Sequence, residues 1–276
     1  MLYNMHAHSN LSHDAISPPA VLCEMAIALG LRGLIFSDHC DPHIHTTEEL
    51  LADADKNFSV YCELEKKYEG ELEIIKSIEV GDAHLFFEAT ETVAGAKPYD
   101  AILGSVHVMK RQDGENIPHT QTDFGAMSEA EIHKYLTEYF DALLFIAQKT
   151  TIDILTHLDL PIRYITGKYE IPIDIERYMP RITEILRTII NRNIALEINT
   201  SEIGKSLNAP LPSLNIIKLY YDMGGRLFTI GSDSHEVSTL ENGLFEARDM
   251  LLSLGIEKAC YFKNRKPIFY SLSEEI

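Results

Sequence analysis

Short apolar segments alternate with longer amphipathic segments along the 276-residue chain, and this alternation limits the folds that the chain can adopt. Seven segments have the length and composition of buried strands: residues 1–5, 33–37, 72–80, 101–106, 152–156, 194–199 and 226–230. Helix-like segments follow them at residues 18–29, 48–68, 85–94, 128–150, 174–191, 212–223 and 240–254. Strands that alternate with helices indicate a parallel sheet with helices packed outside it. We therefore predict a single α/β barrel over residues 1–276.

Local signals mark two helix starts and one long insertion. Ser17, which precedes two prolines, is predicted to cap the first helix. Ser128 followed three residues later by Glu131 predicts a capping box at the start of the fourth helix. Residues 110–124 form the longest polar insertion between predicted elements, and we expect them to form part of a lid.

The composition is that of an ordinary soluble protein, and it disfavours two classes of partner. The formal net charge of −18 argues against nucleic acid and anionic membranes, which select basic surfaces. A small anionic substrate remains compatible with this charge, because bound metal ions reverse the field inside a cleft. The start, MLYNMHAHSN, has neither the basic nor the apolar region of a secretory signal, so we expect none, and no apolar run reaches the ~18 residues that span a membrane. The four cysteines show no CxxC spacing, which favours a cytoplasmic location; the oligomeric state is not indicated.

Histidine and acidic residues stand at or just after the ends of the predicted strands. They are His6, His8, Asp38, His39, Glu79, His107, His157, Glu197, Asp233 and His235. The carboxyl ends of parallel barrel strands meet on one face, so these side chains should line one pocket. Each residue alone could equally be a core or surface residue. Together, imidazole nitrogens and carboxylate oxygens predict a site for several ions of zinc, manganese or iron.

The same segments resemble the polymerase-and-histidinol-phosphatase (PHP) family, particularly its monofunctional histidinol-phosphatase branch. The matching segments are HAHSNLSHD, GLRGLIFSDHCD, SIEVG, ILGSVH, ILTHLD, ALEINTS and TIGSDSH, in the order of the family. The resemblance implies a distorted seven-stranded, TIM-like (β/α) barrel of the PHP type. It also implies a centre of three divalent or transition metal ions.

The resemblance assigns nine metal ligands. The first ion would be held by His6, His8, Glu79 and Asp233; the second by Glu79, His107 and His157; the third by Asp14, His39 and His235. Asp14 fits the family spacing, and the adjacent His13 is the competing candidate. Asn4 stands where many family members have aspartate, and we expect it to support the ligands rather than bind metal.

The resemblance also suggests phosphate-binding residues. Arg163 lies six residues after His157, at a position where this branch has an arginine that contacts phosphate. Lys205 is the nearest match to a second basic residue. A planar guanidinium suits phosphate because it makes two parallel hydrogen bonds. The alternative is that both are solvated surface charges. The remaining histidines match no ligand position, and we expect them on the surface or in loops: His43, His45, His84, His119 and His133.

The resemblance implies hydrolysis of L-histidinol phosphate to L-histidinol and phosphate. Metal ions would activate a water molecule as the nucleophile. Glu79, Asp233 and His235 are the predicted catalytic residues, and the acid that protonates the leaving alkoxide is left open between Asp233 and a bound water. Two alternatives remain: a related phosphoesterase acting on another small phosphomonoester or a nucleotide, and a metal-binding module without turnover.

Overall fold

The computed structural model describes residues 2–111 and 114–273, and a parallel barrel sheet forms its centre. Neighbouring strands follow one another in the order β1 (Tyr3–Asn4), β2 (Gly33–Phe36), β4 (Glu73–Gly81), β5 (Ala101–Ser105), β8 (Ile154–Leu155), β9 (Ala195–Asn199) and β10 (Phe228–Gly231). The short strand β3 (His39–Cys40) also pairs with β4. This arrangement confirms the predicted barrel, although β1 is shorter than the predicted strand 1–5, whose first residue lies outside the described part.

The barrel is nearly closed by backbone hydrogen bonds between the chain around β1 and the chain around β10. The N–H of Met5 donates to the carbonyl of Ile230, and the N–H of Asp233 donates to the carbonyl of His6, both at 2.8 Å. This closure brings the first histidine motif next to Asp233. Two segments that are more than 200 residues apart in the sequence are therefore joined at the site.

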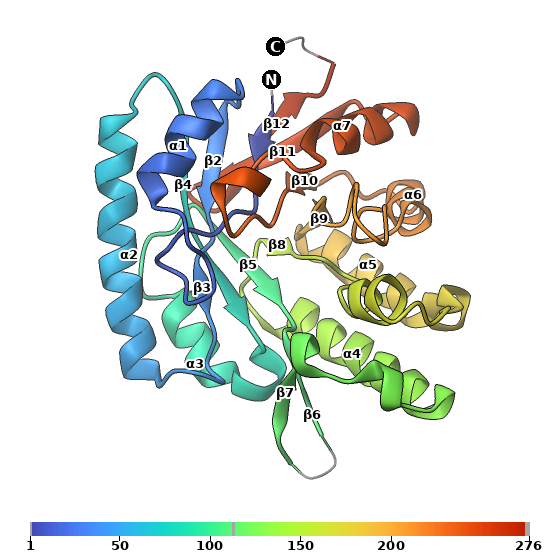
Figure 1. The fold of residues 1–276 in the computed structure, drawn as a ribbon. Coiled ribbons are helices and arrows are strands. Elements are labelled where there is room, and N and C mark those ends of the chain that lie inside the picture. The colour runs from blue at the N-terminus through green and yellow to red at the C-terminus, as the bar shows by residue number, and fades with distance from the viewer. Residues whose placement is uncertain (1, 112–113, 274–276) are drawn as a thin grey trace.

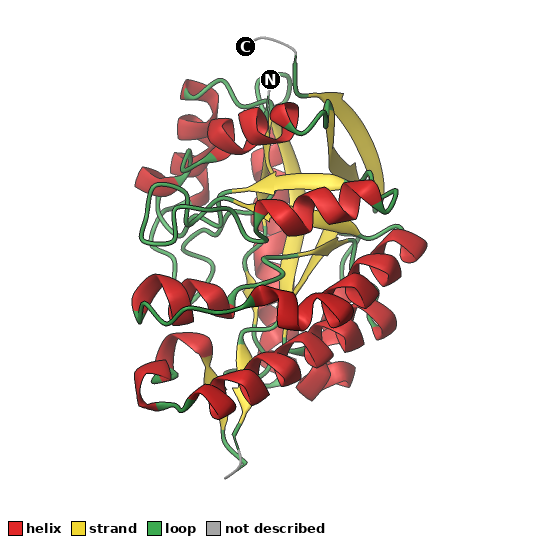
Figure 2. Cartoon of the chain, turned by 90° about the vertical axis from the view of Figure 1, so that its right-hand side faces the viewer, coloured by secondary structure: helices red, strands yellow, loops and turns green. Residues whose placement is uncertain are grey.

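Helices lie outside the strands, as Figures 1 and 2 show. Their bounds are α1 (Pro19–Ala28), α2 (Thr47–Lys67), α3 (Ala83–Ala94), α4 (Glu129–Lys149), α5 (Met179–Arg192), α6 (Leu214–Asp222) and α7 (Leu244–Ser253). All seven predicted helices have a counterpart. The predicted capping box is present at Ser128, but Ser17 does not cap α1, because its hydroxyl accepts the N–H of Val237 instead. In the described ranges, no helix is both long enough and apolar enough to cross a bilayer.

Two hydrophobic clusters fill the space inside and outside the barrel. The larger cluster lies between the strands and the helices. The smaller one fills the barrel interior and includes Met5, Ile35, Ile75, Leu103, Ile154 and Phe262. Phe262 belongs to a C-terminal hairpin of β11 (Lys258–Lys263) and β12 (Lys266–Ser271), which the sequence analysis did not predict. The ring of Tyr261 stacks on Tyr3 at 4.1 Å, which places this hairpin beside β1 (Figure 1).

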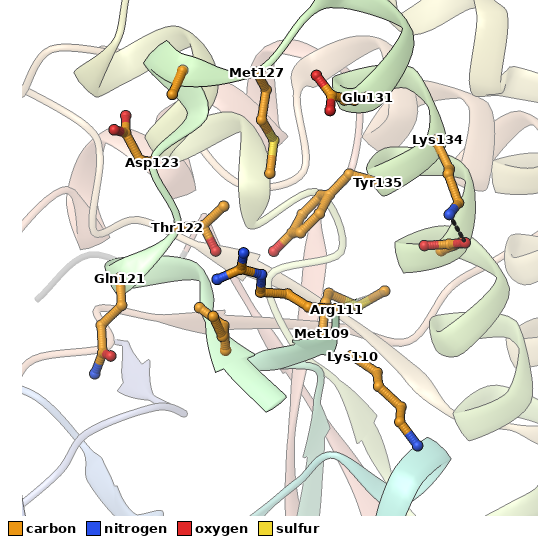
Figure 3. Close-up of a pocket in the computed structure, with 13 residues that line it drawn as sticks. Met109, Lys110, Arg111, Gln121, Thr122, Asp123, Met127, Glu131, Lys134 and Tyr135 are labelled. Atoms are coloured by element: carbon orange, nitrogen blue, oxygen red, sulfur yellow. Dashed lines mark ion pairs between the residues drawn. The ribbon is translucent and has the colours of Figure 1, made fainter. Parts of the chain in front are cut away.

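The polar insertion expected to form part of a lid, residues 110–124, includes residues 112–113, which lie outside the described part, and its described residues belong to a second pair of strands and the turns after them. Strands β6 (Val108–Lys110) and β7 (Asn116–Pro118) pair antiparallel and are followed by two short 3₁₀ turns. With α4, this segment borders a pocket of about 550 Å³, into which Arg111 points toward Tyr135 and Thr122 (Figure 3). None of the nine predicted ligands lines the pocket. The insertion therefore forms a separate cavity rather than a wall of the predicted metal site.

Candidate metal centre

The structure brings all nine predicted ligands to the carboxyl ends of the barrel strands. Eight of them lie in or directly after strands: His6, His8, His39, Glu79, His107, His157, Asp233 and His235. Asp14 reaches the same place from the loop between β1 and α1. The convergence follows from the parallel topology, which puts every strand end on one face.

The first group consists of His6, His8, Glu79 and Asp233. His6 Nε2 lies 3.0 Å from His8 Nε2, 3.4 Å from Glu79 Oε2 and 3.6 Å from Asp233 Oδ1. Zinc binds nitrogen and oxygen ligands at about 2.0–2.2 Å, which puts the ligand atoms of a tetrahedral site roughly 3.3–3.6 Å apart. His8 Nε2 lies 3.6 Å from Glu79 Oε2 and 3.4 Å from Asp233 Oδ1, so the two histidines are at distances of 3.0–3.6 Å from each other and from both carboxylates, close to the spacing of ligands around one metal ion.

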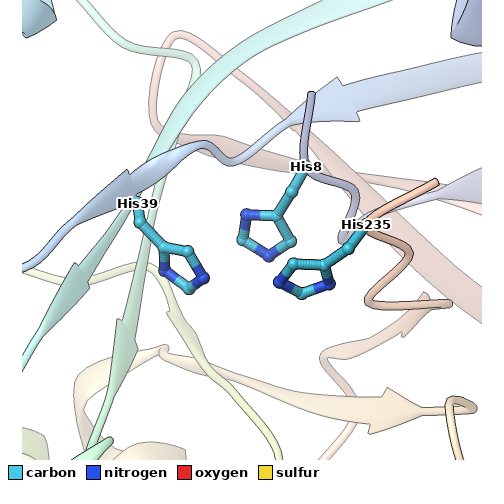
Figure 4. A group of neighbouring side chains, drawn as sticks. All are labelled: His8, His39 and His235. Carbon is cyan, nitrogen blue, oxygen red and sulfur yellow. The ribbon is translucent and has the colours of Figure 1, made fainter. Parts of the chain in front are cut away.

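Two further groups have similar spacings. Glu79 Oε1 lies 3.4 Å from His107 Nε2 and 3.2 Å from His157 Nε2, which forms a second group with Glu79 shared. In the third group, Asp14 Oδ2 lies 3.2 Å from His235 Nε2 and 3.5 Å from His39 Nε2. The rings of His39 and His235 flank His8, as Figure 4 shows, with centroids 4.2 and 4.3 Å away.

Glu79 lies at the centre of these groups and is fully buried. Its Oε2 has no hydrogen-bond partner, although His39 Nδ1 is 3.1 Å away. Burial would raise the pKa of Glu79, but the neighbouring His6 and His107 hold it well below its ordinary value. A buried carboxylate that stays ionised without a hydrogen-bond donor to one of its oxygens fits a cation-binding role.

The pKa values of two histidines of the centre are shifted in opposite directions. Burial would lower the pKa of His6, but Glu197, Glu79 and Asp233 raise it well above its ordinary value. Burial, together with repulsion from His39 and His235, lowers the pKa of His8. The protein alone thus holds some of these imidazoles as cations among carboxylates. Metal ions would replace those protons, since a histidine ligand must be neutral.

Two carboxylates that the sequence analysis did not name as metal ligands, one of which it placed in the same pocket, orient the histidines of the centre. Glu197 Oε1 lies 2.5 Å from His6 Nδ1, and its Oε2 accepts the N–H of His157 at 2.7 Å. Asp41 Oδ1 lies 3.3 Å from His107 Nδ1. Carboxylates that contact the second ring nitrogen of a metal-binding histidine fix the orientation of its ring. The signal for Glu197 was its place on a strand beside the ligands.

Two residues at the site have backbone conformations that residues other than glycine rarely adopt. Asp233 has φ 53°, and His157 has φ 23°. Such left-handed conformations cluster at functional sites, where the surrounding structure holds them. At Gly231, a Cβ atom would lie 2.4 Å from His6 Cβ and 2.8 Å from Glu197 Oε1. The absence of a side chain at Gly231 therefore lets His6 and Glu197 meet.

Buried polar side chains secure the loops that carry the first motifs. Asp38 accepts hydrogen bonds from Ser9, Ser12 and the hydroxyl of Tyr61. Asn4 donates to Ser232 Oγ and accepts the N–H of Ser232, and thus ties β1 to the segment before Asp233. These contacts agree with the supporting role expected for Asn4.

The structure favours Asp14 over His13 for a place at the centre. Asp14 Oδ2 faces His39 and His235, and these histidines hold its pKa below the ordinary value despite its partial burial. The side chains of His13 and Asp14 are equally exposed, so their partners make the difference: His13 Nδ1 is 4.0 Å from Asp41, which is not one of the nine.

Arg163 and Lys205 line one pocket at the mouth of the centre. This pocket has a volume of about 350 Å³ and is also bordered by Asp14, Ile16, Ser201, Glu202, Asp233, His235, Glu236 and Thr239. A π-helical turn (Arg163–Lys168) after β8 presents Arg163, whose Nη2 lies 3.2 Å from Asp233 Oδ2 and whose Nε lies 3.4 Å from Glu202 Oε1. Arg163 is thus fixed beside the metal ligands, whereas Lys205 is exposed at the rim.

The sequence matches the family model of the PHP domain over residues 4–201, which is more than half of the chain. The chain belongs to the PHP family. It is 27% identical to a probable histidinol-phosphatase of Clostridium acetobutylicum over 98% of this chain and 97% of that protein. It is also 27% identical to a probable histidinol-phosphatase of Thermotoga maritima over 93% of this chain and 94% of that protein.

A solved structure has the same fold. The crystal structure of histidinol phosphate phosphatase from Lactococcus lactis, complexed with zinc, L-histidinol and phosphate, matches with a TM-score of 0.77 at 24% identity. The match covers 97% of this chain and 98% of that chain. The comparisons confirm the predicted PHP family and barrel fold, and the prediction that the chain is an enzyme of the phosphatase class.

Among the five other histidines of this PHP chain, His119 lies in a loop, as the surface-or-loop expectation allows, but it is buried rather than exposed. Its ring lies between Tyr135 and the carbonyl of Val106. Burial lowers the pKa of His119 to about 3. It is therefore a neutral core residue. Its backbone N–H donates a hydrogen bond to the backbone carbonyl of His107. An apolar environment cannot be read from the polar sequence around it.

Proposed function

We propose that the chain hydrolyses L-histidinol phosphate to L-histidinol and inorganic phosphate at a centre of three metal ions. The observation that supports it most is the geometry of the three ligand groups. The first two groups share Glu79, and the donor spacings in the first group are 3.0–3.6 Å. Asp14, Asp233 and His235, from the first and third groups, line a pocket that also contains an arginine. The histidinol-phosphatase relatives, and the histidinol and phosphate bound in the Lactococcus lactis structure, support the choice of substrate.

The proposed ligands are the nine residues predicted from the sequence. His6, His8, Glu79 and Asp233 would hold the first ion, Glu79, His107 and His157 the second, and Asp14, His39 and His235 the third. This mixture of nitrogen and oxygen donors suits zinc, manganese or iron. Bound metal ions would supply Lewis-acid chemistry, which polarises phosphoryl oxygens and makes water acidic enough to attack near neutral pH.

The residues of the chain would bind and orient the substrate. Asp233 and Glu202 hold the guanidinium of Arg163 at the pocket, where it would bind two phosphate oxygens and stabilise the charge that develops on them. Lys205 would add a second cation at the rim. Glu79, Asp233 and His235 are the proposed catalytic residues: Asp233 and His235 line the pocket where phosphate would lie, and Glu79 would bridge the first two ions beneath it.

We also propose that residues 1–276 act as one phosphoesterase domain in the cytoplasm. The proposed ligands extend from His6 to His235, and the following β11–β12 hairpin packs against the barrel interior, so both ends of the chain contribute to one structure. All four cysteines are unpaired, as is usual for proteins of reducing compartments. The proposed partner is the small phosphorylated substrate, without nucleic acid or membrane.

Phosphate release tests the proposal. Protein of measured metal content is assayed with L-histidinol phosphate, phosphoserine, a nucleoside monophosphate and p-nitrophenyl phosphate. We expect kcat/KM to be highest for L-histidinol phosphate by at least about 100-fold, since sites built around specific polar contacts reject analogues that lack them. A higher value for another monoester would favour the alternative phosphoesterase, and no turnover with a full complement of metal would indicate a binding module.

A further inference from the structure

A separate group of possible metal ligands lies outside the nine residues of the proposed centre. Asp41 and Asp82 are buried, and His43 is nearly so, with 13% of its side chain exposed. One donor atom from each of the three lies within 4.8 Å of the others. His43 Nδ1 is 3.3 Å from Asp82 Oδ2. The sequence analysis expected His43 on the surface or in a loop and gave the two aspartates no role.

Asp82 carries an unsatisfied oxygen toward this group. Its side chain is fully buried, and its backbone has φ 61°. Oδ1 accepts the N–H groups of His107 and Val108 at 2.7 and 2.9 Å, whereas Oδ2 has no hydrogen-bond partner. The facing His43 Nδ1 also lacks one. A buried carboxylate oxygen is unfavourable unless it accepts a hydrogen bond or binds a cation. We therefore expect a cation or a proton between Asp82 Oδ2 and His43 Nδ1.

We propose that Asp41, His43 and Asp82 bind a fourth divalent metal ion. Two carboxylates and one neutral imidazole compensate the charge of such an ion, and this donor set suits zinc or manganese. Water would complete the coordination from the side of the partly exposed His43. The competing explanation is a protonated His43 that pairs directly with Asp82, which needs no metal.

The position of the fourth ion suggests a positioning role. Asp41 Oδ1 lies 3.3 Å from His107 Nδ1, and Asp82 Oδ1 accepts the N–H of His107. The ion would therefore sit behind His107, a proposed ligand of the second ion, and hold the loop of residues 41–46 against the junction of β4 and α3. None of the three residues lines the pocket that contains Arg163 and Lys205. The proposal of a fourth ion therefore does not rest on the proposed hydrolysis.

Crystals of the full chain grown with zinc, and measured on both sides of the zinc absorption edge, test the proposal directly. We expect an anomalous peak bounded by Asp41, His43 and Asp82 in the wild-type protein, and no such peak in His43→Gln. Metal analysis of dialysed protein should show one equivalent per chain fewer in His43→Gln than in the wild type. His45→Gln, on the same loop but outside the group, should retain the wild-type count.

Two results would overturn the proposal. One is anomalous density confined to the nine ligands of the proposed centre, which would leave the direct His43–Asp82 pair as the explanation. The other is a peak and a metal count that are unchanged in His43→Gln. Failure of the fourth site leaves the proposed hydrolysis intact, because phosphate release depends on the other nine residues. Conversely, a protein without phosphatase turnover would still show the peak.

Discussion

At the scale of single residues, Glu79 connects the ligand groups. Its two oxygens face different neighbours, His107 and His157 on one side and His6, His8 and His39 on the other. A side chain that contacts five histidines can screen two cations from each other only while it remains an anion. The charge of Glu79, rather than its shape, should therefore decide the activity of the centre.

Glu79→Gln keeps the shape and removes the charge. We expect turnover to fall by at least about 100-fold, because two ions lose their shared anion and one of them binds less tightly. The assay is phosphate release with metal content measured on the same sample. Glu73→Gln, at the opposite end of β4 where Glu73 accepts a hydrogen bond from Tyr3, is the control. Near-normal turnover with full metal content would refute the bridging role.

Asp14 and His13 are adjacent in the sequence, and two alanine variants can decide which of them is the metal ligand. Asp14→Ala should lower the metal content by up to one equivalent per chain, since Asp14 faces His39 and His235. His13→Ala should leave the metal content unchanged, since its side chain points to Asp41 and solvent. Metal analysis of both variants after dialysis gives the answer, and a loss confined to His13→Ala would reverse the assignment.

Arg163 is the residue expected to bind phosphate, and methionine preserves much of its aliphatic length. A charge-assisted hydrogen bond is worth about 1.5–3 kcal/mol, so kcat/KM for a phosphomonoester should fall roughly 10- to 150-fold in Arg163→Met. Because Arg163 also contacts Asp233, metal content is measured alongside. Arg181→Met, which breaks ion pairs with Asp141 and Glu184 on the surface, is the control. Equal kcat/KM in both variants would show that Arg163 does not bind phosphate.

At the scale of elements, local signals predicted the barrel strands and the helices but missed both hairpins. The turn of the C-terminal hairpin consists of Asn264 and Arg265, with φ 49° and 63°. Two positive φ angles define the tight turn that usually carries Asn-Gly, and an arginine in the second position hides that signal. Strands β1 and β8 are shorter than the apolar runs that predicted them, because ladder pairing is limited to Tyr3–Asn4 and Ile154–Leu155.

The C-terminal hairpin should stabilise the barrel without taking part in the metal centre. Phe262 is fully buried in the inner cluster, so Phe262→Ala should lower the free energy of unfolding by about 3–5 kcal/mol. Ile268 on the other strand is 41% exposed, and Ile268→Ala should change stability by less than about 1 kcal/mol. Denaturant unfolding measures both. Equal small effects would show that the hairpin is not part of the core.

At the scale of the whole molecule, the site depends on barrel closure. The sequence could predict which residues meet, because parallel strand ends converge whatever the details of packing. It could not predict Glu197 beside His6 or Asp41 beside His107, since those contacts depend on side-chain directions that only the closed barrel fixes. The buried state of His119 depends on the same packing. Tertiary distances, rather than residue types, were the missing information.

This closure makes metal binding part of the folding equilibrium. The proposed ligands lie between residues 6 and 235 and come together only in the folded chain, so metal ions should bind the folded state far better than the unfolded state. A metal ion whose free concentration is 100 times its dissociation constant stabilises the folded state by about 2.7 kcal/mol. At about 2–4 °C per kcal/mol for a domain of this size, removing it should lower Tm by roughly 5–11 °C.

Thermal unfolding of metal-loaded protein, of protein treated with a chelator, and of the treated protein after zinc is restored measures this effect. We expect Tm to fall on chelation and to recover with zinc, by an amount that grows with zinc concentration. Asp14→Ala should show a smaller recovery than the wild type, because it lacks one ligand of the third ion. A chelated sample that metal analysis shows to be empty, yet that unfolds at the same temperature as the loaded protein, would contradict the link between the metal centre and barrel closure.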